Sequence, residues 1–155
     1  MVEPALVSTA ALLYVPTTVA FFRQSILVHL IYFTTATLAL WRHLHPSSDE
    51  YLILEGSFAI LAVTVSLVIL AAIQKKYGFR SWRTLGPAVT GIAATALYFL
   101  KSNCGFGNPE CRSTSEFVVG HSVWHGLLAL SGTLLTVTPV DFPKTLQSTY
   151  WDILK

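Results

Sequence analysis

Residues 58–73 read FAILAVTVSLVILAAI, a run of 16 residues without a charged side chain. A helix that crosses the hydrocarbon core of a bilayer needs about 20 mostly apolar residues. The apolar pattern extends back to Tyr51, and Glu55 is the only charged residue between Tyr51 and the end of the run. This stretch predicts a transmembrane helix and therefore an integral membrane protein.

The composition of the whole chain supports the same class. Of its 155 residues, 53% are hydrophobic and 12% are charged, whereas a soluble domain carries about 25% charged residues. The formal net charge of +2 is small, and no basic tract contains interleaved aromatic residues. We therefore expect membrane lipids as partners and no nucleic acid.

Five segments are apolar enough to be read as spans, and no repeat or polar linker separates them into domains. The predicted fold class is an all-α, multi-span transmembrane bundle of about five helices, in a single membrane domain over residues 1–155. The predicted spans are residues 5–22, 24–42, 51–73, 85–100 and 116–137, followed by an interfacial tail at 139–155. The first two are divided at Arg23 because one helix over both would be about 55 Å long. Pro16 is expected to kink or shorten the first.

The distribution of basic residues predicts the orientation of these spans. Residues 74–84 contain four of the ten basic residues: Lys75, Lys76, Arg80 and Arg83. Short loops rich in Lys and Arg face the cytoplasm, so this loop and the C-terminus are placed on the cytoplasmic or an equivalent side. Cys104 and Cys111, the only cysteines, then lie on the opposite side, either as a disulfide in an oxidising compartment or as two free thiols.

Two histidines mark the start of the last predicted span. Residues 120–126 read GHSVWHG, which places His121 and His125 four residues apart and on one face of a helix. Imidazoles at this spacing can hold one metal ion. Polar residues at this depth normally face the bundle interior. The alternative is that the two histidines form a hydrogen-bonded pair near the interface.

Further polar groups are expected in the same leaflet. His43 and His45 lie at the end of the second span, and Glu55 lies about one turn inside the third. A carboxylate within the membrane needs a partner. For Glu55 this partner is a histidine, a metal ion or a metal-bound water, or alternatively Arg42 near the interface.

The HSVWH motif at 121–125 resembles the last-helix motif of the CREST superfamily of membrane hydrolases. This group includes alkaline ceramidases, adiponectin- and progestin-type receptors, GPI-lipid remodelling enzymes and myomaker-like proteins. The resemblance extends over residues 31–73, where one helix ends at His43 and the next begins with YLILE at 51–55. It implies a zinc-dependent hydrolase that cleaves an amide or ester bond of a lipid.

The resemblance also implies roles for particular residues. His43, His121 and His125 would be the zinc ligands, and Glu55 would stand in the place of the family's catalytic aspartate. The chain departs from the family at Ala39, where a serine belongs, and in having five predicted spans rather than seven. Without a serine hydroxyl to stabilise the oxyanion, we expect either slow turnover or a protein that has lost catalytic activity and serves another role.

The rival reading is a non-catalytic accessory subunit of a larger membrane complex. Small residues at 91–96 and at Ser131–Gly132 suit close helix contacts with a partner, although the same residues can pack the protein's own helices. A small transporter or channel ranks last, because paired broken helices, inverted repeats and charged rings are absent from the sequence.

Overall fold

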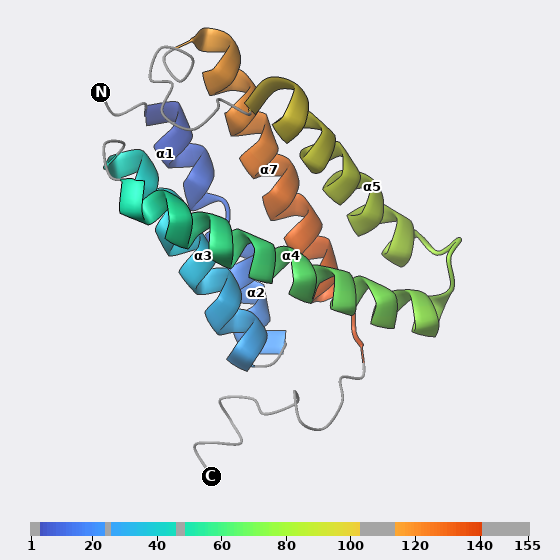
Figure 1. Ribbon diagram of the computed structural model, residues 1–155. Helices are drawn as coiled ribbons and strands as arrows, with labels where there is room; N and C mark the ends of the chain where they lie inside the picture. The colour runs from blue at the N-terminus through green and yellow to red at the C-terminus, as the bar shows by residue number, and fades with distance from the viewer. Residues whose placement is uncertain (1–3, 24–25, 46–48, 103–113, 141–155) are drawn as a thin grey trace.

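The computed structural model describes residues 4–23, 26–45, 49–102 and 114–140, and these segments are almost entirely helical (Figure 1). The helices are α1 (Pro4–Ala11), α2 (Tyr14–Arg23), α3 (Ile26–Leu44), α4 (Asp49–Tyr77), α5 (Trp82–Leu97), the π-helical turn η1 (Tyr98–Ser102) and α7 (Ser115–Val137). The predicted all-α class is confirmed. Three helical stretches are long and apolar enough to cross a membrane: Pro4–Phe22, Ile53–Tyr77 and Ser115–Val137. The chain is therefore a multi-span membrane protein.

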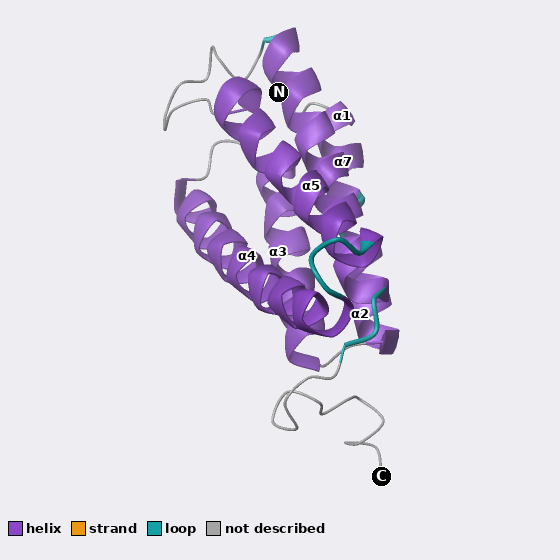
Figure 2. Ribbon diagram, turned by 90° about the vertical axis from the view of Figure 1, so that its right-hand side faces the viewer, coloured by secondary structure: helices purple, strands orange, loops and turns teal. Residues whose placement is uncertain are grey.

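Helix α7 is the central element of the bundle. It packs against α1 and α2 on one side and against α5 and η1 on the other. Helix α3 packs against α1, α2 and α4, and Figure 2 shows α4 on the outside of the bundle beside α3. Most of α4 is exposed, including large apolar side chains such as Ile60 and Leu67. In a membrane this apolar surface faces lipid.

The first predicted span is divided into α1 and α2, and Pro16 explains the division. Proline has no N–H, so it cannot donate to the carbonyl of Leu12, four residues earlier. The Leu12 carbonyl instead accepts from the amide of Val15 at 3.0 Å, and the Leu13 amide donates to the Ala10 carbonyl at 3.0 Å. These hydrogen bonds join residues three apart rather than four, and they interrupt the α-helix at residues 12–13. The expected effect of Pro16 is thus observed.

The turn between α4 and α5 is shorter than the predicted loop of residues 74–84. Helix α4 continues to Tyr77 and ends at Gly78, whose φ of 81° lies in the left-handed region that favours glycine. Helix α5 begins at Trp82, and the hydroxyl of Ser81 caps it by accepting from the amide of Arg83. Local capping thus places the helix ends several residues beyond the points where the apolar pattern stops.

Polar side chains in the bundle bond to neighbouring helices or to their own helix. The hydroxyls of Tyr32 and Ser66 lie 2.7 Å apart and join α3 to α4. Ser131 on α7 donates to the carbonyl of Pro87 on α5 at 3.0 Å. Such bonds are needed because the hydrocarbon core offers no water to satisfy polar groups. They hold α3, α4, α5 and α7 in fixed registers.

The apolar core lies between α2, α3, α4 and α7. Its buried members are Ala20, Val28, Ile31, Tyr32, Ile69, Ile73 and Leu135. The end of α3, the start of α4 and the starts of α1 and α7 meet at the opposite end of the bundle (Figure 1). The polar residues singled out in the sequence are concentrated at that end.

A close contact between α2 and α7 depends on Gly132. A Cβ atom at this position would lie 3.0 Å from Cβ and 3.2 Å from Cγ of Pro16. Since the proline ring is rigid, we expect Gly132→Ala to push α2 away and to lower the free energy of unfolding by about 1–3 kcal/mol. Reversible unfolding of the metal-free protein in detergent measures this loss. Gly126→Ala is the matched control, because nothing lies within 4 Å of its added Cβ.

Three predictions stay untested by the structure. Cys104, Cys111 and most of the predicted tail at 139–155 fall outside the described residues. The direction in which the bundle crosses the membrane also stays a prediction.

Candidate metal centre

Three histidines from two helices come together at one end of the bundle. His43 lies in the last turn of α3, and His121 and His125 lie in the first half of α7. One ring nitrogen of each residue lies within 4.8 Å of the corresponding nitrogens of the other two. This triad can therefore hold a metal ion.

The three imidazole rings are close neighbours and lie nearly perpendicular to one another. The ring centroid of His43 lies 5.2 Å from that of His121 and 5.1 Å from that of His125. The two rings of α7 are 4.7 Å apart. The four-residue spacing aligns His121 and His125 along α7, and the end of α3 supplies the third ring. His125 is completely buried and His121 is 8% exposed.

The triad fits a tetrahedral metal ion. Zinc–nitrogen bonds of about 2.0–2.1 Å place two nitrogen ligands roughly 3.3 Å apart, so small ring rotations bring the nitrogens into range. Nε2 of His125 is buried without a hydrogen-bond partner among the described residues. A buried polar atom without a partner costs about 1–3 kcal/mol, and a metal ion in the triad removes this cost. Imidazole ligands suit zinc, copper, iron and nickel, so the ligand set does not fix the metal.

The other ring nitrogen of His125 contacts α1. Its Nδ1 lies 3.3 Å from Oγ1 of Thr9, 116 residues away along the chain. Sequence reasoning missed Thr9, because a single threonine in an apolar segment carries no pattern that points to a distant histidine. Only the packing of α1 against α7 brings the two side chains together.

Aromatic side chains line one side of the triad. The ring centroid of Trp124 lies 4.7 Å from that of His121 and 5.0 Å from that of His125. Phe117 lies 4.9 Å from His121, and Tyr98 of η1 stacks on Trp124 at 5.0 Å. An apolar wall around a metal site limits the access of water and lowers the local dielectric. Trp124 belongs to the HSVWH motif, but its contacts with the histidines could not be inferred from the sequence alone.

Glu55 forms an ion pair with Arg42. The Oε2 atom of Glu55 lies 3.2 Å from Nε of Arg42, and the side chains are only 16% and 10% exposed. This is the alternative partner that the sequence analysis left open. A carboxylate has two oxygens and about four acceptor positions, so the ion pair does not exclude a second role for Glu55. Its predicted function as a catalytic base stays a prediction.

His45 is not part of the triad. Its ring stacks on Trp41 of the same helix, with the centroids 4.5 Å apart. His45 lies two positions after His43, so the two side chains point in different directions from the helix axis. Of the four histidines expected in this leaflet, the structure brings together His43, His121 and His125 and leaves His45 outside the group.

Two threonines of α3 near Ala39 direct their hydroxyls to other groups than the triad. Ala39 is buried at the expected position. The hydroxyl of Thr35 donates to the carbonyls of Ile31 and Phe58, and that of Thr37 lies 2.9 Å from the hydroxyl of Tyr14. Both hydroxyls therefore join helices to one another.

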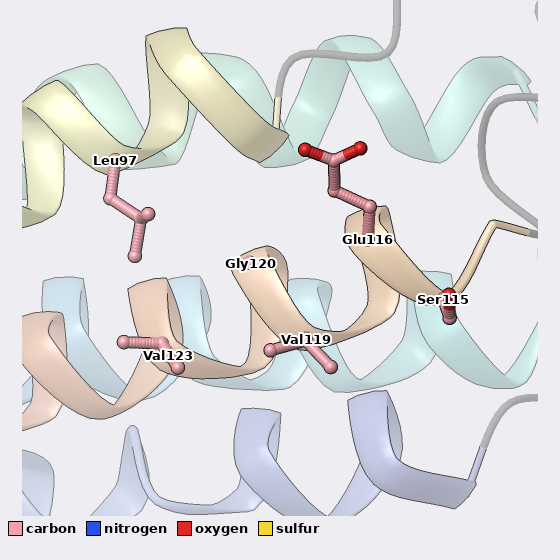
Figure 3. Close-up of a pocket in the computed structure, with 6 residues that line it drawn as sticks. All are labelled: Leu97, Ser115, Glu116, Val119, Gly120 and Val123. Carbon is pink, nitrogen blue, oxygen red and sulfur yellow. The ribbon is translucent and has the colours of Figure 1, made fainter.

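A groove of about 420 Å³ between α5 and α7 is separate from the triad (Figure 3). Its lining residues are Leu97, Ser115, Glu116, Val119, Gly120 and Val123. At 100° per residue, the α7 residues that line the groove lie roughly opposite His121 and His125 around the helix. The groove therefore does not open onto the histidines.

Comparison with known proteins finds no match: no family model, no curated protein and no solved structure corresponds to this chain. Function must therefore be argued from the site itself.

Proposed function

We propose that this protein is a zinc-dependent membrane hydrolase that cleaves an amide or ester bond of a lipid. The observation that carries the proposal is the convergence of His43, His121 and His125. Three protein ligands and one open position are typical of catalytic zinc, whereas structural zinc usually has four protein ligands. Within the described parts of the chain, the metal-binding group contains three residues.

The surroundings of the triad support a lipid substrate. The three histidines lie at the end of α3 and in the first half of α7, and many large apolar side chains are exposed on the outside of the bundle. A lipid in one leaflet presents its amide or ester bond near the headgroup region, at the depth of a helix end. The resemblance of residues 121–125 to membrane hydrolases favours the same substrate class. We therefore favour a lipid over a water-soluble substrate.

The roles of the residues follow from their positions. His43, His121 and His125 would hold the ion, and zinc bound there would lower the pKa of a water molecule to about 7 and polarise a carbonyl group. The aromatic wall formed by Phe117, Trp124 and Tyr98 restricts bulk water. Glu55 accepts a proton during the reaction, and Arg42 orients its carboxylate.

A lipid turnover assay tests this proposal. The full chain, purified and reconstituted in nanodiscs with zinc, is incubated with N-acylated sphingoid lipids and with phospholipid and glyceride esters. We expect fatty acid release that stops when zinc is removed with a chelator and returns when zinc is added. Mass spectrometry of the released fatty acid measures the rate, and His125→Ala is the inactive control.

Three negative results have different meanings. Bound zinc without turnover of any lipid class would contradict hydrolysis and leave a metal site retained for another role. Absence of zinc from the purified protein would contradict the metal centre itself. Absence of zinc together with a stoichiometric protein partner would favour the accessory-subunit reading.

A further inference from the structure

The buried face of α1 points Thr9 toward the metal centre. Leu6 and Ala10 are buried on this face, with Ala10 completely inaccessible, and the half-buried Thr9 lies next to Leu6 at three-residue spacing. The small side chain of Ala10 permits a close approach of α1 to its neighbours, and α1 packs against both α3 and α7. The position of Thr9 is therefore fixed by helix packing.

The other hydrogen bond of Thr9 determines which atom is the donor in its contact with His125. A threonine hydroxyl has one proton and two acceptor positions. Oγ1 of Thr9 donates to the carbonyl of Ala5, 2.8 Å away. The same oxygen, 3.3 Å from Nδ1 of His125, is then left to accept. Nδ1 of His125 accordingly carries the proton and donates a hydrogen bond to Oγ1 of Thr9.

This direction fixes the tautomer of His125. A neutral imidazole protonated on Nδ1 has its free lone pair on Nε2, and a metal ion binds through that lone pair. Nε2 is the buried nitrogen of His125 that lacks a hydrogen-bond partner among the described residues. The two nitrogens are separated by one ring carbon and their hydrogen-bonding directions diverge, so the contact with α1 leaves Nε2 available to the triad.

We propose that Thr9 is a positioning residue of the metal centre, which holds His125 in the Nδ1-protonated form and aims Nε2 at the ion. Through this contact α1 becomes part of the site, although it supplies no ligand. Metal binding is thereby coupled to the docking of α1 on α7. The inference rests on the metal binding in the proposed function and is independent of hydrolysis.

Zinc affinity tests the inference in the full chain. Removal of the group that orients a metal-binding histidine typically lowers metal affinity by 10–100-fold. We expect Thr9→Val, which keeps the shape of the side chain, to weaken zinc binding by this factor in a competition with a chromophoric chelator. Thr9→Ser keeps the hydroxyl and should retain affinity within about threefold, since the tautomer is preserved.

The matched control is Thr18→Val. Thr18 also donates to the carbonyl four residues earlier, that of Tyr14 at 2.9 Å, but its side chain is exposed on α2. This control should bind zinc as the unchanged protein does. The absorption spectrum of the Co²⁺-loaded protein gives a second readout, because it reports ligand geometry: Thr9→Val should alter the spectrum, and Thr9→Ser should preserve it.

The outcomes separate this inference from the proposed function. Equal zinc affinity and equal cobalt spectra for Thr9→Val and the unchanged protein would overturn the role of Thr9 while leaving the metal centre intact. Failure of the unchanged protein to bind either ion would overturn both. Should Thr9→Val not fold, Thr9→Ala is the second variant, with the same expected loss and the same rescue by serine.

Discussion

Replacement of His125 by alanine is expected to abolish stoichiometric zinc binding. The unchanged protein should contain about one zinc ion per chain, and His125→Ala should contain almost none. His125 is the most buried member of the triad, and its removal leaves two ligands, too few for a stable site. Elemental analysis of the purified protein after dialysis against a weak chelator measures the loss.

Two other histidines of the chain are internal controls. His45 stacks on Trp41, and Nδ1 of His29 lies 3.1 Å from the carbonyl of Thr17, so the described contacts place both outside the triad. His45→Ala and His29→Ala should retain zinc. If either control loses as much metal as His125→Ala, or if His125→Ala retains the ion, the assignment of ligands is wrong.

The sequence alone could predict the class of fold and the ends of several helices. The uncharged run at 58–73 identifies a span because lipid excludes charge, and this rule acts on each segment separately. It could not predict that α4 extends to Tyr77 or that α5 begins at Trp82. Those boundaries depend on capping geometry, which an apolar pattern does not record.

The residues of the candidate site also differ in how far they can be predicted from the sequence. The spacing of His121 and His125 is a local property of one helix, so the sequence predicts that they share a face. Counting the spans placed His43 in the same leaflet as this pair, but its choice as the third ligand rested on the resemblance to membrane hydrolases. Thr9 and the aromatic wall depend on how α1, α7 and η1 pack, and these contacts join residues up to 116 positions apart.

The ion pair between Arg42 and Glu55 should dominate the stability of this end of the bundle. Both side chains are largely buried, and removal of one partner leaves an uncompensated buried charge, which costs about 3–5 kcal/mol. We expect Glu55→Leu or Arg42→Met to lower the free energy of unfolding by about 3 kcal/mol. The double variant Glu55→Leu, Arg42→Met should recover most of this loss. Replacing a buried ion pair by an apolar pair of similar volume changes the free energy of unfolding little.

The double variant also decides between the two roles of Glu55. If Glu55 only anchors Arg42, the stable double variant should hydrolyse lipid at close to the original rate. If Glu55 also transfers a proton, the double variant should fold and bind zinc but lose about 10²–10⁴ in rate. Unfolding, zinc content and turnover are measured on the same preparations. If Glu55 has only a structural role, the single variants should lose stability and the double variant should keep its turnover. We expect loss of turnover with zinc retained, and restored turnover would assign Glu55 to structure alone.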